Sequence, residues 1–175
     1  ANLQLSNFIF TGNQNLIIGN VSEKDKKKVE KLIEKFEIEK NVSSMRKSSM
    51  ACVALPTCPL ALAEAQRYLP ELVTKIEPIL EKHGLSEDEI SIRMTGCPNG
   101  CGRPYVAELG FVGTAAEQYN FMLGGDRYGL RLNKLYKEKL SEQEILEEVD
   151  YLFSRFVNEK NHNETFGDYA NRVIL

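Results

Sequence analysis

The sequence lacks a long apolar run, a strong excess of one charge and a signal peptide. No stretch approaches the roughly 18 consecutive apolar residues that span a bilayer. The first residues, ANLQLSNFIF, contain neither a basic region nor a cleavage site. The net charge is −3, and acids interleave the lysines of residues 24–40, so a general nucleic-acid binder is not expected. We therefore expect a cytoplasmic protein that binds neither membranes nor nucleic acids.

Cysteine is scarce and unevenly distributed. The four cysteines occur only in two short segments, ACVALPTCP with Cys52 and Cys58, and TGCPNGCGRPY with Cys97 and Cys101. Because no export signal is present, a reducing compartment is expected, where thiols more often bind metals or act in catalysis than form disulfides.

Spacing alone leaves three interpretations of these thiols open. A zinc site prefers two to four residues between paired cysteines, and the segment from Cys52 to Cys58 is longer than that. An iron–sulfur cluster needs four thiolates on loops that wrap around it, and prolines and glycines crowd both segments. Spacing thus favours a cluster, while zinc and disulfides remain alternatives.

The chain as a whole predicts an α+β fold. Apolar runs at 8–10 and 16–18 flank a Gly-Asn turn, which is typical of a β-hairpin. A helix is expected after Ser22, with an apolar face, and another from Pro59 to His83 with a break at its internal prolines. Further strands are expected in ISIRMTG, AELGFVGTA and YNFMLGGD. A capped helix from Ser141 should bury one side, made of Ile145, Val149, Leu152, Phe153 and Phe156.

Two segments carry a family resemblance. SMACVALPTCPLALAEAQRYLP and RMTGCPNGCGRPYVAELGFVG resemble the two cluster-binding motifs of the siroheme-dependent sulfite and nitrite reductases. The second satisfies that family's signature at Thr95, Gly96, Cys97, Cys101, Glu108, Leu109, Gly110 and Phe111. TGNQNLIIGNV, LGGDRYGLRL and FGDY are also similar to that family, and the two cysteine segments favour its sulfite-reducing branch.

The resemblance implies a domain organisation and a set of metal ligands. Residues 1–40 would form a ferredoxin-like half-domain, the second copy of a repeat, and residues 41–175 a 4Fe-4S/siroheme-binding domain. The cluster ligands implied are Cys52, Cys58, Cys97 and Cys101. Of these, Cys101 would also be the axial ligand of the siroheme iron, so that one sulfur joins the two cofactors.

Other residues receive roles near the siroheme from the same resemblance. Gln14 and Asn15 would contact its carboxylates, and Arg103 would pair with one through its fork of donors. Asn99 would place an N–H group near sulfur. No catalytic residue is assigned to this chain.

The activity implied is the six-electron reduction of sulfite to hydrogen sulfide in sulfate assimilation and cysteine biosynthesis, with an NADPH-dependent flavoprotein subunit as electron donor. The alternatives are part of a siroheme nitrite reductase, or a non-catalytic module whose thiols hold zinc or nothing. In the family, the cations that grip sulfite come largely from the N-terminal half, whereas this chain resembles only the C-terminal half. We therefore expect the N-terminal half of the same polypeptide as a partner, and little sulfite reduction by this chain alone.

Overall fold

The computed structural model describes residues 7–38, 40 and 42–175. The chain divides into two compact units, Ala1–Val42 and Ser43–Leu175. Residues 1–6 and 39 of the first predicted domain, and residue 41 of the second, lie outside the described residues.

The first unit is a hairpin followed by a helix, as predicted. Strand β1 (Asn7–Phe10) pairs antiparallel with β2 (Leu16–Gly19), and helix α1 (Glu23–Lys35) comes next. No residue of α1 is buried, and Phe36 just beyond it is 66% exposed. The apolar face predicted for this helix is therefore not covered in the structure.

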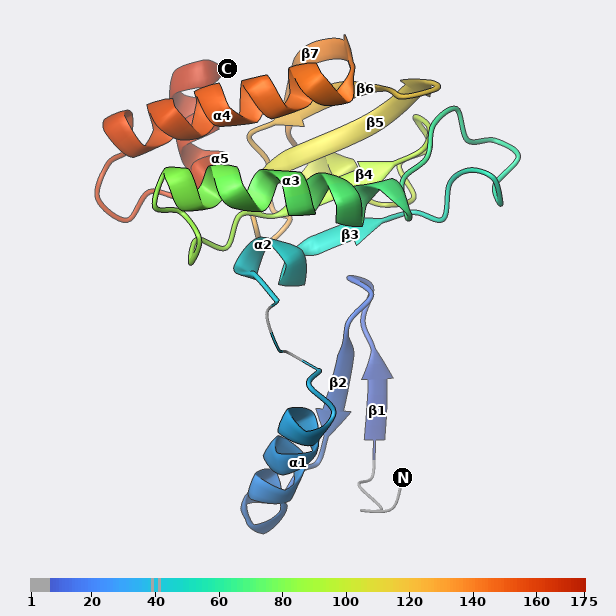
Figure 1. Ribbon diagram of the computed structural model, residues 1–175, viewed down its shortest axis with the longest axis vertical. Helices are drawn as coiled ribbons and strands as arrows, with labels where there is room; N and C mark the ends of the chain where they lie inside the picture. The colour runs from blue at the N-terminus through green and yellow to red at the C-terminus, as the bar shows by residue number, and fades with distance from the viewer. Residues whose placement is uncertain (1–6, 39, 41) are drawn as a thin grey trace. The chain divides into compact units, whose positions relative to one another are not determined.

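The second unit contains a five-stranded mixed sheet in the order β3-β4-β5-β6-β7 (Figure 1). Its strands are β3 (Ser49–Ala51), β4 (Ile92–Thr95), β5 (Leu109–Ala115), β6 (Gln118–Leu123) and β7 (Lys134–Leu140). The first three run parallel, whereas β5, β6 and β7 form an antiparallel meander. The sheet and its helices confirm the predicted mixture of α and β structure.

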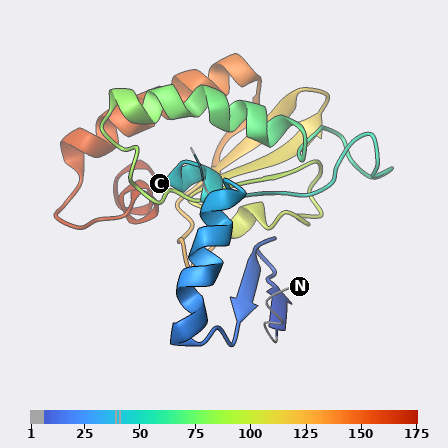
Figure 2. The same cartoon turned by 60° about the horizontal axis from the view of Figure 1, so that its bottom comes forward.

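Two long helices, α3 (Tyr68–Lys82) and α4 (Glu142–Glu159), lie side by side over one face of this sheet (Figures 1 and 2). Asp150 of α4 joins them, because its carboxylate accepts from the Lys82 ammonium at 2.7 Å and contacts the His83 ring at 2.6 Å. Four short helical segments complete the unit, namely α2 (Ser44–Lys47), a 3-10 turn (Pro104–Val106), α5 (Phe166–Tyr169) and a π-helical turn (Ala170–Ile174). The hydrophobic core lies between the two long helices and the sheet.

The prediction for α4 is confirmed in detail. The helix begins after Ser141, whose hydroxyl and backbone N–H both bond to the Glu144 carboxylate, at 2.6 and 2.8 Å. Its buried residues are Ile145, Val149, Leu152, Phe153 and Phe156. Local capping and a period of 3.6 residues were sufficient signals here.

One other prediction needs correction, and one strand was not predicted. The helix expected from Pro59 begins only at Tyr68, and it continues through Pro78 without a break. Strand β7 was not predicted, because its sequence KLYKEKL is mostly charged and mostly exposed.

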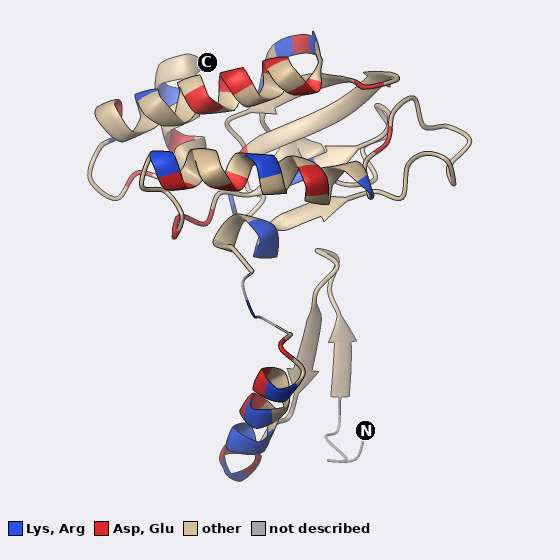
Figure 3. Cartoon of the chain, viewed as in Figure 1, with Lys and Arg blue, Asp and Glu red and all other residues tan. Residues whose placement is uncertain are grey.

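Charged residues are frequent along α1, α3 and α4, whereas β5 and β6 carry none (Figure 3). Among the described residues, no helix combines the length and the apolar character that crossing a membrane requires.

Candidate functional site

The two cysteine segments follow neighbouring parallel strands. Strand β3 pairs with β4 in a register that sets Ala51 opposite Met94. Cys52 continues this ladder, since its backbone N–H donates to the Met94 carbonyl at 3.1 Å. Because parallel strands end at the same edge of a sheet, the loops that begin at Cys52 and Gly96 leave the fold side by side.

The sulfur of Cys52 already accepts two hydrogen bonds. The Thr95 hydroxyl lies 3.4 Å from it, and the Gly96 backbone N–H donates to it at 3.3 Å. Such donors favour a sulfur that carries negative charge, as a metal-bound thiolate does.

Hydrogen bonds also fix the first cysteine loop against the second. The Cys58 N–H donates to the Ala54 carbonyl at 2.8 Å, which closes a tight turn inside the loop. The N–H groups of Leu62 and Ala63 both donate to the Gly96 carbonyl, at 2.7 and 3.0 Å. The two cysteine loops are therefore held together by hydrogen bonds and do not form independent segments.

The four thiols differ in exposure. Cys97 is buried at 7% exposure, Cys52 and Cys58 are half-buried, and Cys101 is exposed. All four are free thiols. Within the described part of the chain, no three His, Cys, Asp or Glu side chains are grouped closely enough to hold a single metal ion.

Gly102 lets the second loop return tightly onto the strands. A Cβ atom at this position would lie 2.2 Å from the Met94 carbonyl oxygen and 3.0 Å from the Cys52 nitrogen. Since both contacts are to backbone, no side-chain movement can relieve them. The residue after Cys101 must therefore be glycine for the loop to close in this way.

Tyr105 packs against the second cysteine loop and donates a hydrogen bond to it. Its hydroxyl donates to the Pro98 carbonyl at 3.0 Å. Its ring packs against Gly100, because a Cβ atom added to Gly100 would lie only 2.7 Å from Cε2 of Tyr105. Burial, followed by the nearby Cys97 thiol, raises the pKa of the Tyr105 hydroxyl. The hydroxyl therefore remains a hydrogen-bond donor at neutral pH. Cys97 and Cys101 flank the segment that this tyrosine holds.

We expect the Tyr105→Phe variant to loosen this loop while keeping the fold. Loss of one net hydrogen bond costs about 1 kcal/mol, so the buried Cys97 thiol should react several-fold faster with an alkylating reagent. Mass spectrometry of the labelled cysteines measures the rate. The control is Tyr128→Phe, at a side chain that is 76% exposed. Equal labelling rates in wild type and Tyr105→Phe would contradict the support assigned to the hydroxyl.

Glu108, the acid of the signature motif, is buried and holds neighbouring segments of the fold together. It is 1% exposed, and its carboxylate accepts from the Ser91 N–H at 2.8 Å, the Ser91 hydroxyl at 3.1 Å and the Gly167 N–H at 2.9 Å. Burial is the main influence on its pKa and raises it. Glu108 therefore ties the start of β4 and the C-terminal FGDY segment to β5, rather than facing the cysteine loops.

The remaining predicted site residues lie on turns. Asn99 and Arg103 are exposed on the second cysteine loop, and the Arg103 N–H donates to the Gly100 carbonyl at 2.7 Å. Gln14 and Asn15 lie in the hairpin turn of the first unit, where the Gln14 N–H donates to the Thr11 carbonyl at 3.1 Å. The structure thus brings the cysteines, Asn99 and Arg103 into one unit and places Gln14 and Asn15 in the other.

Arg93 is a buried charged residue that the sequence analysis did not single out. It belongs to β4, two residues before Thr95, and is only 8% exposed. The signal was present, because a charged residue interrupts the otherwise uncharged ISIRMTG strand.

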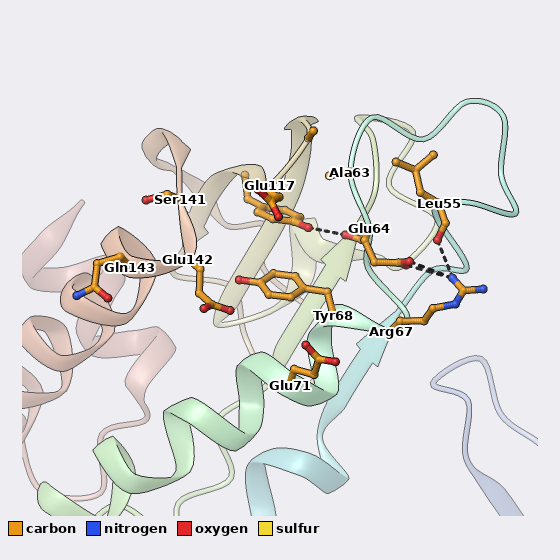
Figure 4. Close-up of a pocket in the computed structure, with 12 residues that line it drawn as sticks. Leu55, Ala63, Glu64, Arg67, Tyr68, Glu71, Glu117, Ser141, Glu142 and Gln143 are labelled. Atoms are coloured by element: carbon orange, nitrogen blue, oxygen red, sulfur yellow. Dashed lines mark hydrogen bonds and ion pairs between the residues drawn. The ribbon is translucent and has the colours of Figure 1, made fainter.

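A cavity of about 710 Å³ lies beside the first cysteine loop (Figure 4). Glu64, Glu71, Glu117 and Glu142 line it, and its one lining arginine, Arg67, pairs with Glu64 at 3.1 Å. This acidic lining disfavours an anion such as sulfite. The cavity is therefore not the anion site that the family resemblance implies.

Comparison with known proteins gives a consistent result, although no protein-family model matches the chain. The sulfite reductase (NADPH) hemoprotein beta-component of Leptospira biflexa is 58% identical over 169 residues, covering 95% of this chain and 30% of that protein. The same component from Vibrio vulnificus is 54% identical, covering 99% of this chain and 30% of that protein. That of Staphylococcus carnosus is 53% identical, with 98% and 31% covered.

The chain is similar to the sulfite reductase hemoproteins. The predicted family resemblance is thereby confirmed, and the chain spans about 30% of the length of these curated relatives. Structural comparison extends the similarity to the fold. The solved structure of the Mycobacterium tuberculosis NirA protein matches with a TM-score of 0.74 at 25% identity, covering 95% of this chain and 32% of that one.

Proposed function

We propose that this chain forms the cluster- and siroheme-binding part of an assimilatory sulfite reductase hemoprotein. In the complete protein, sulfite is reduced to hydrogen sulfide by six electrons that an NADPH-dependent flavoprotein subunit supplies. The observation that carries this proposal is the parallel pairing of β3 with β4, which sets both cysteine loops at one sheet edge. Identities of 58% and 53% to sulfite reductase hemoproteins support the same assignment.

The donor set fits an iron–sulfur cluster. Four free thiols lie on two mutually hydrogen-bonded loops, and thiolate is the ligand of choice for such clusters. The two hydrogen bonds to the Cys52 sulfur suit a cluster ligand, whose charge they stabilise. The residues proposed to hold the cluster are Cys52, Cys58, Cys97 and Cys101.

Siroheme would bind on the exposed side of the second loop. Cys101 is the exposed thiol of the four, so its sulfur is available to a second metal. Arg103 and Asn99 are exposed on the same loop and offer donors to carboxylates and to sulfur. The siroheme contacts expected of Gln14 and Asn15 stay a prediction. When bound, the siroheme supplies an iron site for sulfite, and the cluster supplies electrons one at a time.

Under this proposal, the rest of the site comes from outside this chain. The acidic cavity beside the first loop cannot hold sulfite, and the chain spans about 30% of its curated relatives. The cations that grip the anion would come from the N-terminal half of the complete hemoprotein, in the cytoplasm. We therefore expect little sulfite reduction by this chain alone.

Cofactor uptake by the chain tests the proposal. We expect anaerobic reconstitution with iron, sulfide and siroheme to give a coloured chain with about five irons, four in a single 4Fe-4S cluster and one in the siroheme, and with about four acid-labile sulfides. The matched control is the chain with all four cysteines changed to serine, which should stay colourless. A chain that binds one zinc ion, without iron uptake or visible absorption, would instead support the non-catalytic module.

Turnover separates the two reductase alternatives. The complete hemoprotein that contains this segment should reduce sulfite in preference to nitrite, whereas the isolated chain should do neither at a comparable rate. A preference for nitrite would assign the segment to a siroheme nitrite reductase. Full sulfite turnover by the isolated chain would refute the division of the site between the two halves.

A further inference from the structure

Arg93 lies on the face of the sheet that is turned away from α3 and α4. Its neighbours Ile92 and Met94 belong to the hydrophobic core under those helices. Because successive strand residues point to opposite faces, Arg93 and Thr95 share the other face. The Thr95 hydroxyl lies 3.4 Å from the Cys52 sulfur, so this face also carries a proposed cluster ligand.

The end of the second cysteine loop covers this face. Gly110 pairs with Arg93 in the β4–β5 register, and a Cβ on Gly110 would lie 2.4 Å from the Pro104 carbonyl oxygen. A Cβ on Gly102 would lie 2.2 Å from the Met94 carbonyl oxygen. The segment from Gly102 to Pro104 is therefore pressed onto the strands beside Arg93, which explains why this arginine is only 8% exposed.

The positive charges of Arg93 and Arg103 act on each other. Burial, followed by the charge of Arg103, lowers the pKa of the Arg93 guanidinium. An arginine nevertheless remains protonated at neutral pH, because its ordinary pKa is so high. Arg93 is therefore a fixed cation, held beneath the loop that carries Cys97 and Cys101.

We propose that Arg93 is a fixed positive charge that raises the reduction potential of the cluster held by the four cysteines. This inference rests on the proposed function. Arg93 and Thr95 are two residues apart on one face of β4, about 7 Å along the strand, and the Thr95 hydroxyl lies 3.4 Å from the Cys52 sulfur. Arg93 is only 8% exposed, and a charge inside a protein acts strongly on its surroundings because solvent screening there is weak.

The sign of the effect follows from the charge balance. A cluster with four thiolate ligands is anionic, and one-electron reduction by a flavin or by dithionite makes it more negative by one charge. A nearby cation therefore stabilises the reduced form more than the oxidised form. Arg93 would favour reduction of the cluster electrostatically and would not touch the substrate. It is therefore not a catalytic residue.

The test is a redox titration of the chain reconstituted with iron and sulfide but without siroheme. We expect Arg93→Gln to lower the equilibrium constant for one-electron reduction at least tenfold, a fall of about 59 mV. Arg93→Lys should restore most of the wild-type potential, because it keeps the charge. The matched control is Lys75→Gln on α3, which removes one positive charge on the opposite side of the sheet.

The outcomes are distinguishable. Equal potentials for Arg93→Gln, Lys75→Gln and wild type would overturn the inference and leave the proposed function intact. Failure of the wild-type chain to take up iron and sulfide would instead overturn the proposed function, and the inference with it. If Arg93→Gln does not assemble a cluster, Arg93→Met, which removes the charge but keeps an unbranched side chain, should lower the potential in the same direction. An unchanged potential in that variant would overturn the inference.

Discussion

The Gly102→Ala variant is expected to lose about 3 kcal/mol of stability, the upper range for overpacking a tight site. Its added methyl group would lie 2.2 Å from the Met94 carbonyl oxygen and 3.0 Å from the Cys52 nitrogen, so backbone must move. The movement separates the second loop from the first, and cluster uptake should fall with it. Calorimetry should show the melting temperature lower by on the order of 10 °C, and iron analysis should show reduced loading.

Gly19 provides the control for this variant. A Cβ at Gly19 would meet its nearest atom, Cβ of Asn7, at 3.5 Å, which is an ordinary van der Waals contact. Gly19→Ala should therefore leave both melting temperature and iron content close to wild type. If Gly102→Ala behaved like Gly19→Ala, the tight closure of the second loop over the strands would be wrong.

Helix α4 and the segment before α3 show where local sequence was sufficient and where it was not. Helix α4 carries its own cap and a regular apolar stripe, so its start and its buried side were predictable. Residues 59–67 are rich in helix formers, yet they form turns. Distant groups hold them, since Leu62 and Ala63 donate to the Gly96 carbonyl and the Tyr119 hydroxyl donates to the Glu64 carbonyl at 2.7 Å. Such contacts override local propensity and cannot be read from a window of sequence.

The candidate site also combines features that the sequence shows with features that only the structure shows. The cysteine spacings and their surrounding motif were visible in the sequence, and the structure adds the parallel strands that set the two loops together. Tyr105 was missed because its contacts depend on the path of the second loop, whereas Arg93 was visible as a charge within a strand but its burial was not. The structure shows the Tyr105 ring against Gly100, and it shows the segment from Gly102 to Pro104 pressed onto the strands beside Arg93.

Replacing either cysteine of the second loop with serine is expected to cause a large loss of the iron–sulfur cluster. Cys97→Ser and Cys101→Ser each replace a soft thiolate with a weak hard donor, so cluster content should fall roughly tenfold or more in both variants. Iron, acid-labile sulfide and visible absorption measure the loss. The control is Thr57→Ser, a conservative change at an exposed residue of the first loop. Wild-type iron content in both cysteine variants would show that these thiols are not ligands.

Thiol labelling then distinguishes ligation from a merely structural role for the cysteines. In the cofactor-free chain, exposed Cys101 should react with an alkylating reagent first, and Cys97, at 7% exposure, last. Cluster binding should protect all four thiols, and the change should be greatest at Cys101, because packing does not shield that sulfur. If Cys101 still reacted at its cofactor-free rate in the iron-loaded chain, it could not be a cluster ligand, and the proposal that its sulfur joins cluster and siroheme would fail with it.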